Sequence, residues 1–446
     1  MHQQSGDFPA ALQLIDRLVD TYPAMAALHL KRGAIRWSNK QFHQAIESFD
    51  QASRLEPGNA DAFFCKATAH QSLGQDAQAL ADYERTLAIH PRHVQALNNK
   101  AVLLREAGRV REAITAYEKA IGADPNCSQA WVGKALCELL LGDWEKGWRS
   151  YEWRKMQFGP WGSRSRSPEW RGETLAGKTL LIQAEQGLGD TVQFCRYAKL
   201  AKKAGAKVIL QAQDRLTRFL STLDPNISVV PGSDPAPECD YHVMLLSMPA
   251  ICGTEENMIP GKDAYLAAAP DRVARWKGRI GTDGFKIGIH WQGERKWEGV
   301  EKSGDKERSF PLHAFRGIAQ IADVRLINLQ KNDGVEQLAG LPDGMHVELA
   351  DQEFDTGSDS FLDTAAIIAN LDLVITSDTA IAHVAGALGS PTWLALQHVP
   401  DWRWQLDRPD SPWYPRMRLF RQSERGDWSS VFKAMECALA RRMIST

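Results

Sequence analysis

A repeat of 34 residues in the first third of the sequence restricts the fold more than any other feature. Prolines, small residues, aromatic residues and glycines each recur at this interval. In that order they are Pro23, Pro57, Pro91 and Pro125; Ala11, Ala45, Ala79 and Ala113, followed by Gly147; Phe49, Tyr83, Tyr117 and Tyr151; and Gly74, Gly108 and Gly142, with Gly6 in phase and Lys40 at the place between. Each glycine lies between two helical patterns, each small residue lets paired helices approach, and each proline ends a second helix. The pattern predicts stacked helix pairs.

This repeat resembles the tetratricopeptide repeat family, which implies an α-helical superhelix. About three full repeats lie between residues 26 and 127, flanked by a partial repeat that already contains Met1 and by residues 128–153. We therefore expect a tetratricopeptide-repeat domain at residues 1–157. The concave face of such a superhelix commonly holds a peptide, so a protein partner is expected. The alternative is that so short an array only packs against the neighbouring domain.

Length and composition limit the remaining possibilities. A chain of 446 residues is long enough for two or three domains. A net charge of −2 gives no overall attraction for nucleic acid, which we do not expect as a partner. The seven cysteines form no C-x-x-C pair, and no apolar run approaches the roughly 18 residues that would span a bilayer. We expect a soluble, cytoplasmic protein without a transmembrane segment, and peripheral membrane contact stays open.

The repeat pattern gives way to a linker at residues 158–177, which is rich in glycine, proline, serine and arginine. Trp161 and Trp170 lie in this segment. Because large aromatic side chains dominate the energetics of interfaces, we expect these tryptophans to attach the array to the next domain rather than to bind a ligand.

Short apolar segments alternate with helical ones after Lys178. The expected strands are residues 180–184, 207–211, 228–230 and 242–246 in a first series, and 286–291, 324–330, 346–349, 373–376 and 392–396 in a second. Two such series predict two parallel-sheet α/β domains facing each other across a cleft, at residues 178–283 and 284–446. The closing amphipathic segment 428–441 could pack on either one.

A conspicuous turn follows the first of these strands. Gly187 and Gly189 make a tight turn, and Asp190 opens a helix. A carboxylate is thereby placed at the carboxyl edge of a sheet, where ligands of open α/β sheets bind. Asp190 could be a catalyst or only a helix cap. The turn lacks the third glycine of a dinucleotide fingerprint, which makes a dehydrogenase a remote alternative.

A second polar cluster follows the strand that ends at Thr376. Ser377, Asp378 and Thr379 can cap the next helix, and His383 lies one turn beyond Thr379. Polar groups thus gather at the carboxyl edge of a second sheet. Capping and ligand binding are compatible here, and both readings stay open.

Five motifs occur in one order along the α/β part. They are Glu185-Gln-Gly-Leu-Gly-Asp190 with Phe194, Arg196 and Tyr197; Gly288-Ile-His-Trp-Gln-Gly293; Arg308-Ser-Phe-Pro311; Leu329-Gln-Lys331; and Asp378-Thr-Ala-Ile-Ala-His383 with Gly386-Ala-Leu-Gly389. Together they resemble the heptosyltransferase-like (family 9-like) glycosyltransferases that carry N-terminal tetratricopeptide repeats. The resemblance runs from Lys178 to about Phe420. It implies the GT-B architecture of two Rossmann-like domains, with an acceptor-side first half, a donor-binding second half and inverting chemistry without a metal ion.

The resemblance also implies roles for individual residues. It makes Asp190 the catalytic base. The residues expected to bind substrate or donor are Gln186, Gly187, Gly189, His290, Gln292, Arg308, Lys331, Ser377, Asp378, Thr379, Ala380 and His383. No metal or other cofactor is expected, and the nucleotide sugar is a substrate. Without a metal, Arg308 and Lys331 could neutralise the charge of the leaving diphosphate. Alternatively, each could be a solvated surface charge.

Two departures from the family pattern leave the transferred sugar open. Ala380 stands where a glycine often follows Asp-Thr, and residues 294–307 form a longer insert. Trp402, Trp404 and Trp413 follow the last expected strand and could stack on a sugar or base, although we expect core packing for at least two of them.

The sequence therefore predicts a metal-independent inverting glycosyltransferase. It would move a sugar from a nucleotide-sugar donor to a hydroxyl acceptor, such as a protein recruited by the repeats, which would make the reaction protein O-glycosylation. The alternatives are a transferase acting on a lipopolysaccharide-type glycan and a non-catalytic tetratricopeptide-repeat scaffold.

Overall fold

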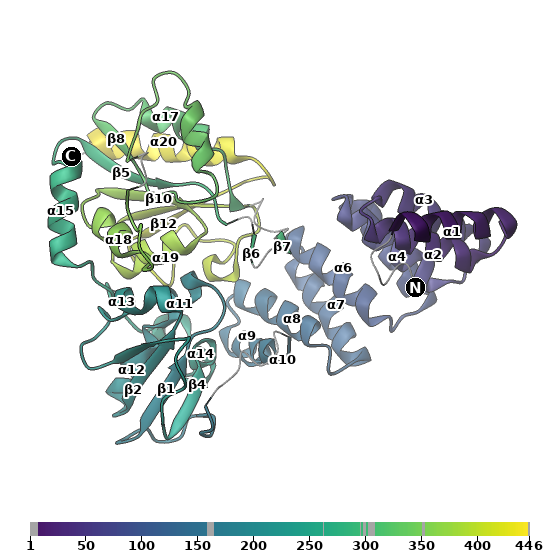
Figure 1. The fold of residues 1–446 in the computed structure, drawn as a ribbon, viewed down its shortest axis with the longest axis horizontal. Coiled ribbons are helices and arrows are strands. Elements are labelled where there is room, and N and C mark those ends of the chain that lie inside the picture. Colours follow the sequence, from purple (N-terminus) through teal and green to yellow (C-terminus); the bar gives the residue numbers. More distant parts are fainter. Residues whose placement is uncertain are drawn as a thin grey trace. The chain divides into compact units, whose positions relative to one another are not determined.

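The computed structural model describes residues 8–157, 165–261, 263–294, 296–297, 300–301, 308–349 and 353–444. Gly6, Trp161 and most of the insert at 294–307 lie outside the described residues. The chain divides into two compact units, Met1–Cys137 and Glu138–Thr446 (Figure 1).

The first unit is an array of antiparallel helix pairs. Its helices are α1 (Phe8–Thr21), α2 (Ala26–Ser38), α3 (Phe42–Leu55), α4 (Ala60–Ser72), α5 (Asp76–Ile89), α6 (Val94–Glu106), α7 (Val110–Ala123) and the larger part of α8 (Ser128–Leu140). The repeated glycines Gly74 and Gly108 end first helices with φ of +71° and +76°. Lys40 adopts the same left-handed conformation at φ 59°. The expected α-helical repeat array is confirmed.

A ladder of ion pairs that was not predicted from the sequence joins successive repeats. A basic residue on each first helix faces an acidic residue on the preceding second helix, and both sets keep the 34-residue interval. The pairs are Arg32–Asp16 at 3.7 Å, Lys66–Asp50 at 3.3 Å, Lys100–Glu84 at 2.9 Å and Lys134–Glu118 at 3.3 Å. Because the acidic side chains are partly exposed, each pair adds only about 0–1 kcal/mol and mainly fixes the register between repeats.

The second unit begins with helices that continue the repeat pattern. After the end of α8 come α9 (Trp144–Tyr151) and α10 (Arg154–Gln157). Trp148 is buried, its ring lies 5.2 Å from that of Trp402, and its indole N–H donates to the Thr254 carbonyl (3.0 Å). These helices thus pack on the α/β part with the aromatic contacts that we had expected from the linker. Trp170, by contrast, packs at β4 (Tyr241–Met244), where its backbone N–H donates to His242.

The first α/β half holds a four-stranded parallel sheet in the order β3-β2-β1-β4. Besides β4, its strands are β1 (Thr179–Gln183), β2 (Lys207–Ala212) and β3 (Ser228–Pro231). Its helices are α11 (Leu188–Phe194), α12 (Tyr197–Lys203), α13 (Thr217–Leu220) and α14 (Met248–Ile251). The helical segment between β1 and β2 is divided in two, since α11 ends at Phe194 and α12 begins at Tyr197.

The second half holds a six-stranded parallel sheet in the order β12-β11-β10-β5-β8-β9. The strands are β5 (Phe285–His290), β8 (Val324–Asn328), β9 (Val347–Glu348), β10 (Leu373–Ser377), β11 (Thr392–Leu396) and β12 (Met417–Arg421), while β6 (Lys296–Trp297) and β7 (Val300–Glu301) pair in the insert. The helices are α15 (Pro270–Ile280), α17 (Arg316–Ala319), α18 (Leu362–Ile368), α19 (Ala380–Ala387) and α20 (Trp428–Ile444). Strand β12 was not predicted, because Arg418 and Arg421 interrupt its apolar pattern at the sheet edge.

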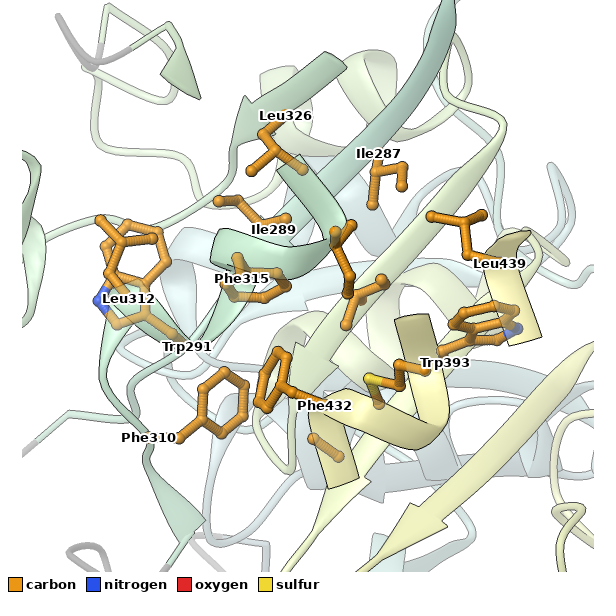
Figure 2. Packing of buried hydrophobic residues seen from close by; sticks show 14 of the residues in the cluster. Ile287, Ile289, Trp291, Phe310, Leu312, Phe315, Leu326, Trp393, Phe432 and Leu439 are labelled. Carbon is orange, nitrogen blue, oxygen red and sulfur yellow. The ribbon is translucent and has the colours of Figure 1, made fainter. Parts of the chain in front are cut away.

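The core of the second half explains where the closing helix packs. Figure 2 shows Phe432 of α20 beside Phe310 and Phe315, whose ring centroids both lie 4.9 Å from that of Phe432. Leu439 of the same helix is fully buried in this cluster. Helix α20 therefore belongs to the second half, which decides between the two alternatives.

Both sheets reverse their strand order beside their first strand. In the first half β2 and β4 lie on opposite sides of β1, and in the second half β8 and β10 lie on opposite sides of β5. Such switch points create a crevice at the carboxyl ends of the strands, where ligands of open α/β sheets bind. The motif residues that follow β1, β5 and β10 are therefore placed at the two switch points. The expected fold class, a helical repeat array followed by two parallel-sheet α/β halves of GT-B type, is confirmed.

Buried Arg196 joins the two α/β halves. Its guanidinium donates to the Trp413 carbonyl (3.1 Å) and to the Tyr265 hydroxyl (2.7 Å). Its Nε donates to the Gln193 carbonyl (2.8 Å).

In the part of the chain that the structure describes, no helix is long and apolar enough to cross a membrane.

Candidate active site

Asp190 is one turn into α11, directly after the turn that follows β1. Its Oδ2 accepts a hydrogen bond from the Gly187 backbone N–H (2.9 Å), so the carboxylate does cap the helix. The side chain nevertheless keeps 21% exposure. The capping role is therefore real and leaves part of the carboxylate open to a substrate.

The other carboxylate oxygen of Asp190 contacts Arg403, a residue of the second half. Arg403 lies in the 3₁₀ helix η6 (Trp402–Trp404), and its Nη2 bonds the Asp190 Oδ1. Its Nη1 donates to Asp401 Oδ1 (2.9 Å), and its Nε donates to Gln193 Oε1 (2.5 Å). The guanidinium also lies 4.4 Å from the centroid of the Trp402 ring. A charged clamp thus connects the two halves at Asp190.

Burial and charge act in opposite senses on Asp190. Burial raises the pKa of its carboxyl above the ordinary value, while the charge of Arg403 and the Gly187 N–H act against this. Asp401 raises the same pKa and Arg308 lowers it. Asp190 is consequently a stronger base than an exposed aspartate, held close to a balancing positive charge.

The polar cluster after β10 is buried at the second switch point. The Ser377 hydroxyl is buried and has no hydrogen-bond partner among the described residues. Burial raises the pKa of Asp378 to about 6, the charge of Asp401 adds to this, and Arg308 opposes it. Arg308 also donates from Nη1 to the Asp378 carbonyl (3.5 Å). Asp378 and Arg308 are therefore neighbours.

His290 lies on the strand next to β10. Its Nδ1 lies 3.2 Å from the Thr379 hydroxyl, which places the end of β5 beside the start of α19. Burial lowers the pKa of His290 to about 3, so the ring is neutral at physiological pH. A neutral imidazole here can hold a hydroxyl group but adds no positive charge for a diphosphate.

His383 is a second buried, neutral imidazole. Its Nδ1 lies 2.9 Å from the Tyr414 hydroxyl, and its ring stacks on Trp404 with centroids 5.6 Å apart. Burial lowers the pKa of His383 well below 6.5, and the positive charges of Arg403 and Arg196 add to the effect. His383 thus makes protein contacts through Nδ1 and one ring face.

Gly189 and Ala380 bring the two motif helices together. A Cβ built on Gly189 would lie 2.9 Å from His383 Cδ2 and 3.3 Å from Ala380 Cα. The lack of a side chain on Gly189 therefore lets α11 approach α19. The alanine that replaces the family's glycine takes part in this contact.

Gln292 and Lys331 lie in loops after β5 and β8. The side chain of Gln330 organises the first loop, because its Oε1 accepts from the backbone N–H groups of Trp291 and Gln292, both at 3.0 Å. The Lys331 ammonium donates to the carbonyls of Phe354 and Asp355 (2.9 Å to Asp355), so in this structure it holds a neighbouring loop.

Gln186 adopts a left-handed backbone conformation with φ of 62°. Its carbonyl accepts from Gln213 Nε2 (3.1 Å), and its side-chain oxygen accepts from the Tyr151 hydroxyl (3.3 Å). Backbone strain of this kind persists only where neighbouring contacts hold it, and it gathers at functional sites.

Comparisons with known proteins identify the families that parts of this chain match. The tetratricopeptide repeat family matches residues 2–60, 31–93, 64–126 and 98–147. Residues 309–396 match glycosyltransferase family 9 (heptosyltransferase). The chain combines tetratricopeptide repeats with a glycosyltransferase family 9 domain. The resemblance to heptosyltransferase-like proteins with such repeats is thereby confirmed.

One curated relative and several solved structures share similarity with the chain. Protein FlbA of Caulobacter vibrioides is 28% identical over 335 residues, which are 69% of this chain and 54% of FlbA, so the chain spans about half the length of that relative. The crystal structure of MamA is 20% identical with a TM-score of 0.33, covering 35% of this chain and 92% of MamA. That of YrrB, a repeat protein with an unusual peptide-binding site, is 18% identical with a TM-score of 0.31, covering 35% and 80%.

The family 9 match contains only part of the candidate site. Lys331 and the cluster from Ser377 to His383 lie inside the matched segment, and Arg308 directly precedes it. Asp190, His290 and Gln292 lie outside it. Their assignment as site residues of the family 9 domain stays a prediction that rests on the geometry of the switch points.

Arg403 and Asp401, which lie beside the predicted base, are not among the residues predicted from the sequence. Trp402 and Trp404 of the same segment are buried together with Trp413, so the expected core packing is confirmed. No local pattern marks Arg403, because its partners Asp190 and Gln193 lie more than 200 residues earlier in the chain.

A cavity of about 100 Å³, lined by Arg218, Arg272 and others, includes none of the candidate residues.

Proposed function

We propose that this protein is a metal-independent inverting glycosyltransferase. It transfers a sugar from a nucleotide-sugar donor to a hydroxyl group of a protein that the repeat array recruits. The contact between α11 and α19 carries this proposal, because it brings Asp190 of the first half beside the part of the second half that matches family 9.

Asp190 is the proposed catalytic base. The acceptor hydroxyl gives its proton to the carboxylate while its oxygen forms a bond with the anomeric carbon of the donor. The bond between that carbon and the diphosphate oxygen breaks, and its electron pair leaves with the nucleoside diphosphate. Attack on the face opposite to the leaving group inverts the configuration.

The leaving diphosphate requires positive charge and hydrogen-bond donors. Arg308 lies beside Asp378, and the first backbone N–H groups of α19 point away from the helix, where they can donate to an anion. The hydroxyl groups of Ser377 and Thr379 can also donate to this anion. Lys331 can take the same role once its ammonium leaves the carbonyls of Phe354 and Asp355.

The variant Asp190→Asn tests the base. We expect transfer to fall by about 10²- to 10⁴-fold while donor binding, measured by calorimetry with a panel of nucleotide sugars, persists. Thr115→Ala on the exposed side of α7 serves as a control and should act like the wild type. Unchanged turnover of Asp190→Asn would remove Asp190 as base.

The acceptor is identified by intact-mass analysis of candidate proteins co-expressed with the wild type or with Asp190→Asn. A mass added only by the wild type names the class of sugar and shows a protein acceptor. The family description, heptosyltransferase, favours a glycan as the second candidate acceptor. A chain that begins at Ser128 should lose transfer to a protein acceptor and largely keep transfer to a small glycan.

Failure to bind any nucleotide sugar would instead favour a scaffold that recruits partners through its repeats.

We place the reaction in the cytoplasm, because all seven cysteines are free thiols and such thiols fit a reducing compartment.

A further inference from the structure

The clamp around Asp190 contains a guanidinium that is itself fixed on several sides. Arg403 is 9% exposed, and its three nitrogen atoms bond Asp190, Asp401 and Gln193. Its carbon Cζ lies 4.4 Å from the Trp402 ring centroid and 5.7 Å from that of Phe194. A side chain held this way has little freedom left to lose during a reaction.

We propose that Arg403 is a positioning residue for the transfer reaction, which orients the Asp190 carboxylate and supplies the positive charge that keeps it ready to accept a proton. This inference rests on the proposed function, since it assigns a role to Asp190 as base. Arg403 acts through Asp190 and need not touch the substrate.

The surroundings of Asp190 make this charge necessary. Asp401 faces it with a negative charge from the start of η6, and burial also favours the protonated form. Arg308 faces it with a positive charge, while the Tyr151 hydroxyl of α9 is neutral, its pKa raised to about 12 by burial. Burial and Asp401 both raise the pKa of Asp190. Without Arg403, only Arg308 and the Gly187 N–H among these groups would act to lower it.

A base must be unprotonated before the reaction starts. In the proposed step the proton moves from the acceptor hydroxyl to Asp190, so an Asp190 that already carries a proton cannot act. Removing the positive charge of Arg403 raises the pKa of Asp190, because a neighbouring arginine favours the carboxylate form. The rate would then fall at a higher pH on the acidic side of its pH profile.

The test compares the pH dependence of kcat in the wild type, Arg403→Met, Arg403→Lys and Arg421→Met. Arg421 is a matched control, because its Nη2 donates to the Trp404 and Gln405 carbonyls (3.3 and 2.7 Å) and so holds the same segment without contacting Asp190. In Arg403→Met we expect the acidic limb, which is the fall of kcat on the acidic side of its pH profile, to move to a pH about one to three units higher. It should stay within about half a pH unit of wild type in Arg403→Lys and in Arg421→Met.

Two results would overturn the inference. One is an acidic limb of Arg403→Met that coincides with that of the wild type. The other is an equal displacement in Arg421→Met, which would mean that the loop conformation and not the charge matters.

A second measurement covers the case in which Arg403→Met has no measurable turnover. The carboxyl carbon of Asp190 is then titrated by NMR in protein with labelled aspartate, with Asp190→Asn for assignment. A higher pKa in Arg403→Met supports the inference, and equal values contradict it. Absence of transfer by the wild type itself would remove the proposed function, whereas this titration would still decide whether Arg403 sets the protonation of Asp190.

Discussion

The hydroxyl of Tyr151 donates a hydrogen bond to the side-chain oxygen of Gln186 (3.3 Å). Tyr151 is the last aromatic residue of the 34-residue repeat, and Gln186 belongs to the turn that leads into Asp190. In the preceding repeats this tyrosine position faces the next repeat: the Tyr83 hydroxyl accepts from Asn99, and the Tyr117 ring lies against Gly133. The α/β part therefore takes the place of a following repeat at α9.

Removing this hydrogen bond should slow the enzyme. Tyr151→Phe keeps the ring but leaves the strained Gln186 with one fewer contact, and one hydrogen bond is worth about 0.5–1.5 kcal/mol. We expect kcat to fall by about 2- to 10-fold and the free energy of unfolding to fall by about 1 kcal/mol, measured by steady-state kinetics and urea unfolding.

Tyr117→Phe is the matched control for Tyr151→Phe. The Tyr117 hydroxyl is buried at the same repeat position but has no hydrogen-bond partner among the described residues. Its removal should leave kcat unchanged and should not destabilise the protein. Equal kinetic effects of the two substitutions would show that the bond to Gln186 does not matter.

The buried ion pair between Arg154 and Glu185 should make residues 138–157 indispensable to the α/β part. Arg154 is fully buried, and its Nη2 and Nε donate to the two carboxylate oxygens of Glu185 (2.7 and 3.1 Å). Arg154→Met leaves the Glu185 charge buried without its partner, which typically costs about 3–5 kcal/mol. We expect a loss of that size in urea unfolding.

The exposed pair Arg149–Glu145 provides the comparison for Arg154→Met. Arg149→Met should change the free energy of unfolding by less than about 0.5 kcal/mol. The double variant Arg154→Met with Glu185→Gln should recover part of the lost stability, since it removes the unpaired charge. A small effect of Arg154→Met would mean that α10 is not an integral part of this unit.

Gly189→Ala should push α11 and α19 apart. The new methyl group would lie 2.9 Å from His383 and 3.3 Å from the backbone of Ala380, and overpacking of this kind costs about 1–3 kcal/mol. We expect both lower stability and lower turnover, because the contact connects Asp190 with the segment that we propose binds the donor. Gly278→Ala in α15 is the control, since nothing lies within 4 Å of its added methyl group. It should stabilise the protein by up to about 1 kcal/mol without changing kcat.

The sequence predicted those features that depend on local patterns. The 34-residue interval, the β-branched strands and the turns after them each carry a periodicity or a composition that physics ties to one structure. The boundary between the units could not be predicted, because α9 keeps the repeat pattern while Trp148 and Arg154 pack on residues far along the chain. Arg403 was missed for the same reason. Its neighbours Gln193 and Asp190 are brought to it only by the packing of one half on the other.

Buried neutral histidines should make the protein less stable in mild acid. The pKa of His290 is about 3 in the folded chain and about 6.5 in an unfolded one, so the unfolded state binds more protons as pH falls below 6.5. Stability due to this group is present above pH 6.5 and decreases as pH falls toward 3. Between pH 7 and pH 5 the loss from His290 is about 2 kcal/mol.

The variant His290→Gln isolates this contribution. Asp378, with its pKa raised to about 6, acts in the opposite sense over part of the same range, so the wild-type protein shows only the net effect. Urea unfolding at pH 7 and pH 5 should show a smaller loss in His290→Gln than in the wild type, by about 2 kcal/mol. His43→Gln, on the exposed side of α3, should lose as much stability as the wild type. If His290→Gln and the wild type lose the same amount, the pKa of His290 is the same in the folded and unfolded chain, and its ring is charged in the folded protein at pH 5.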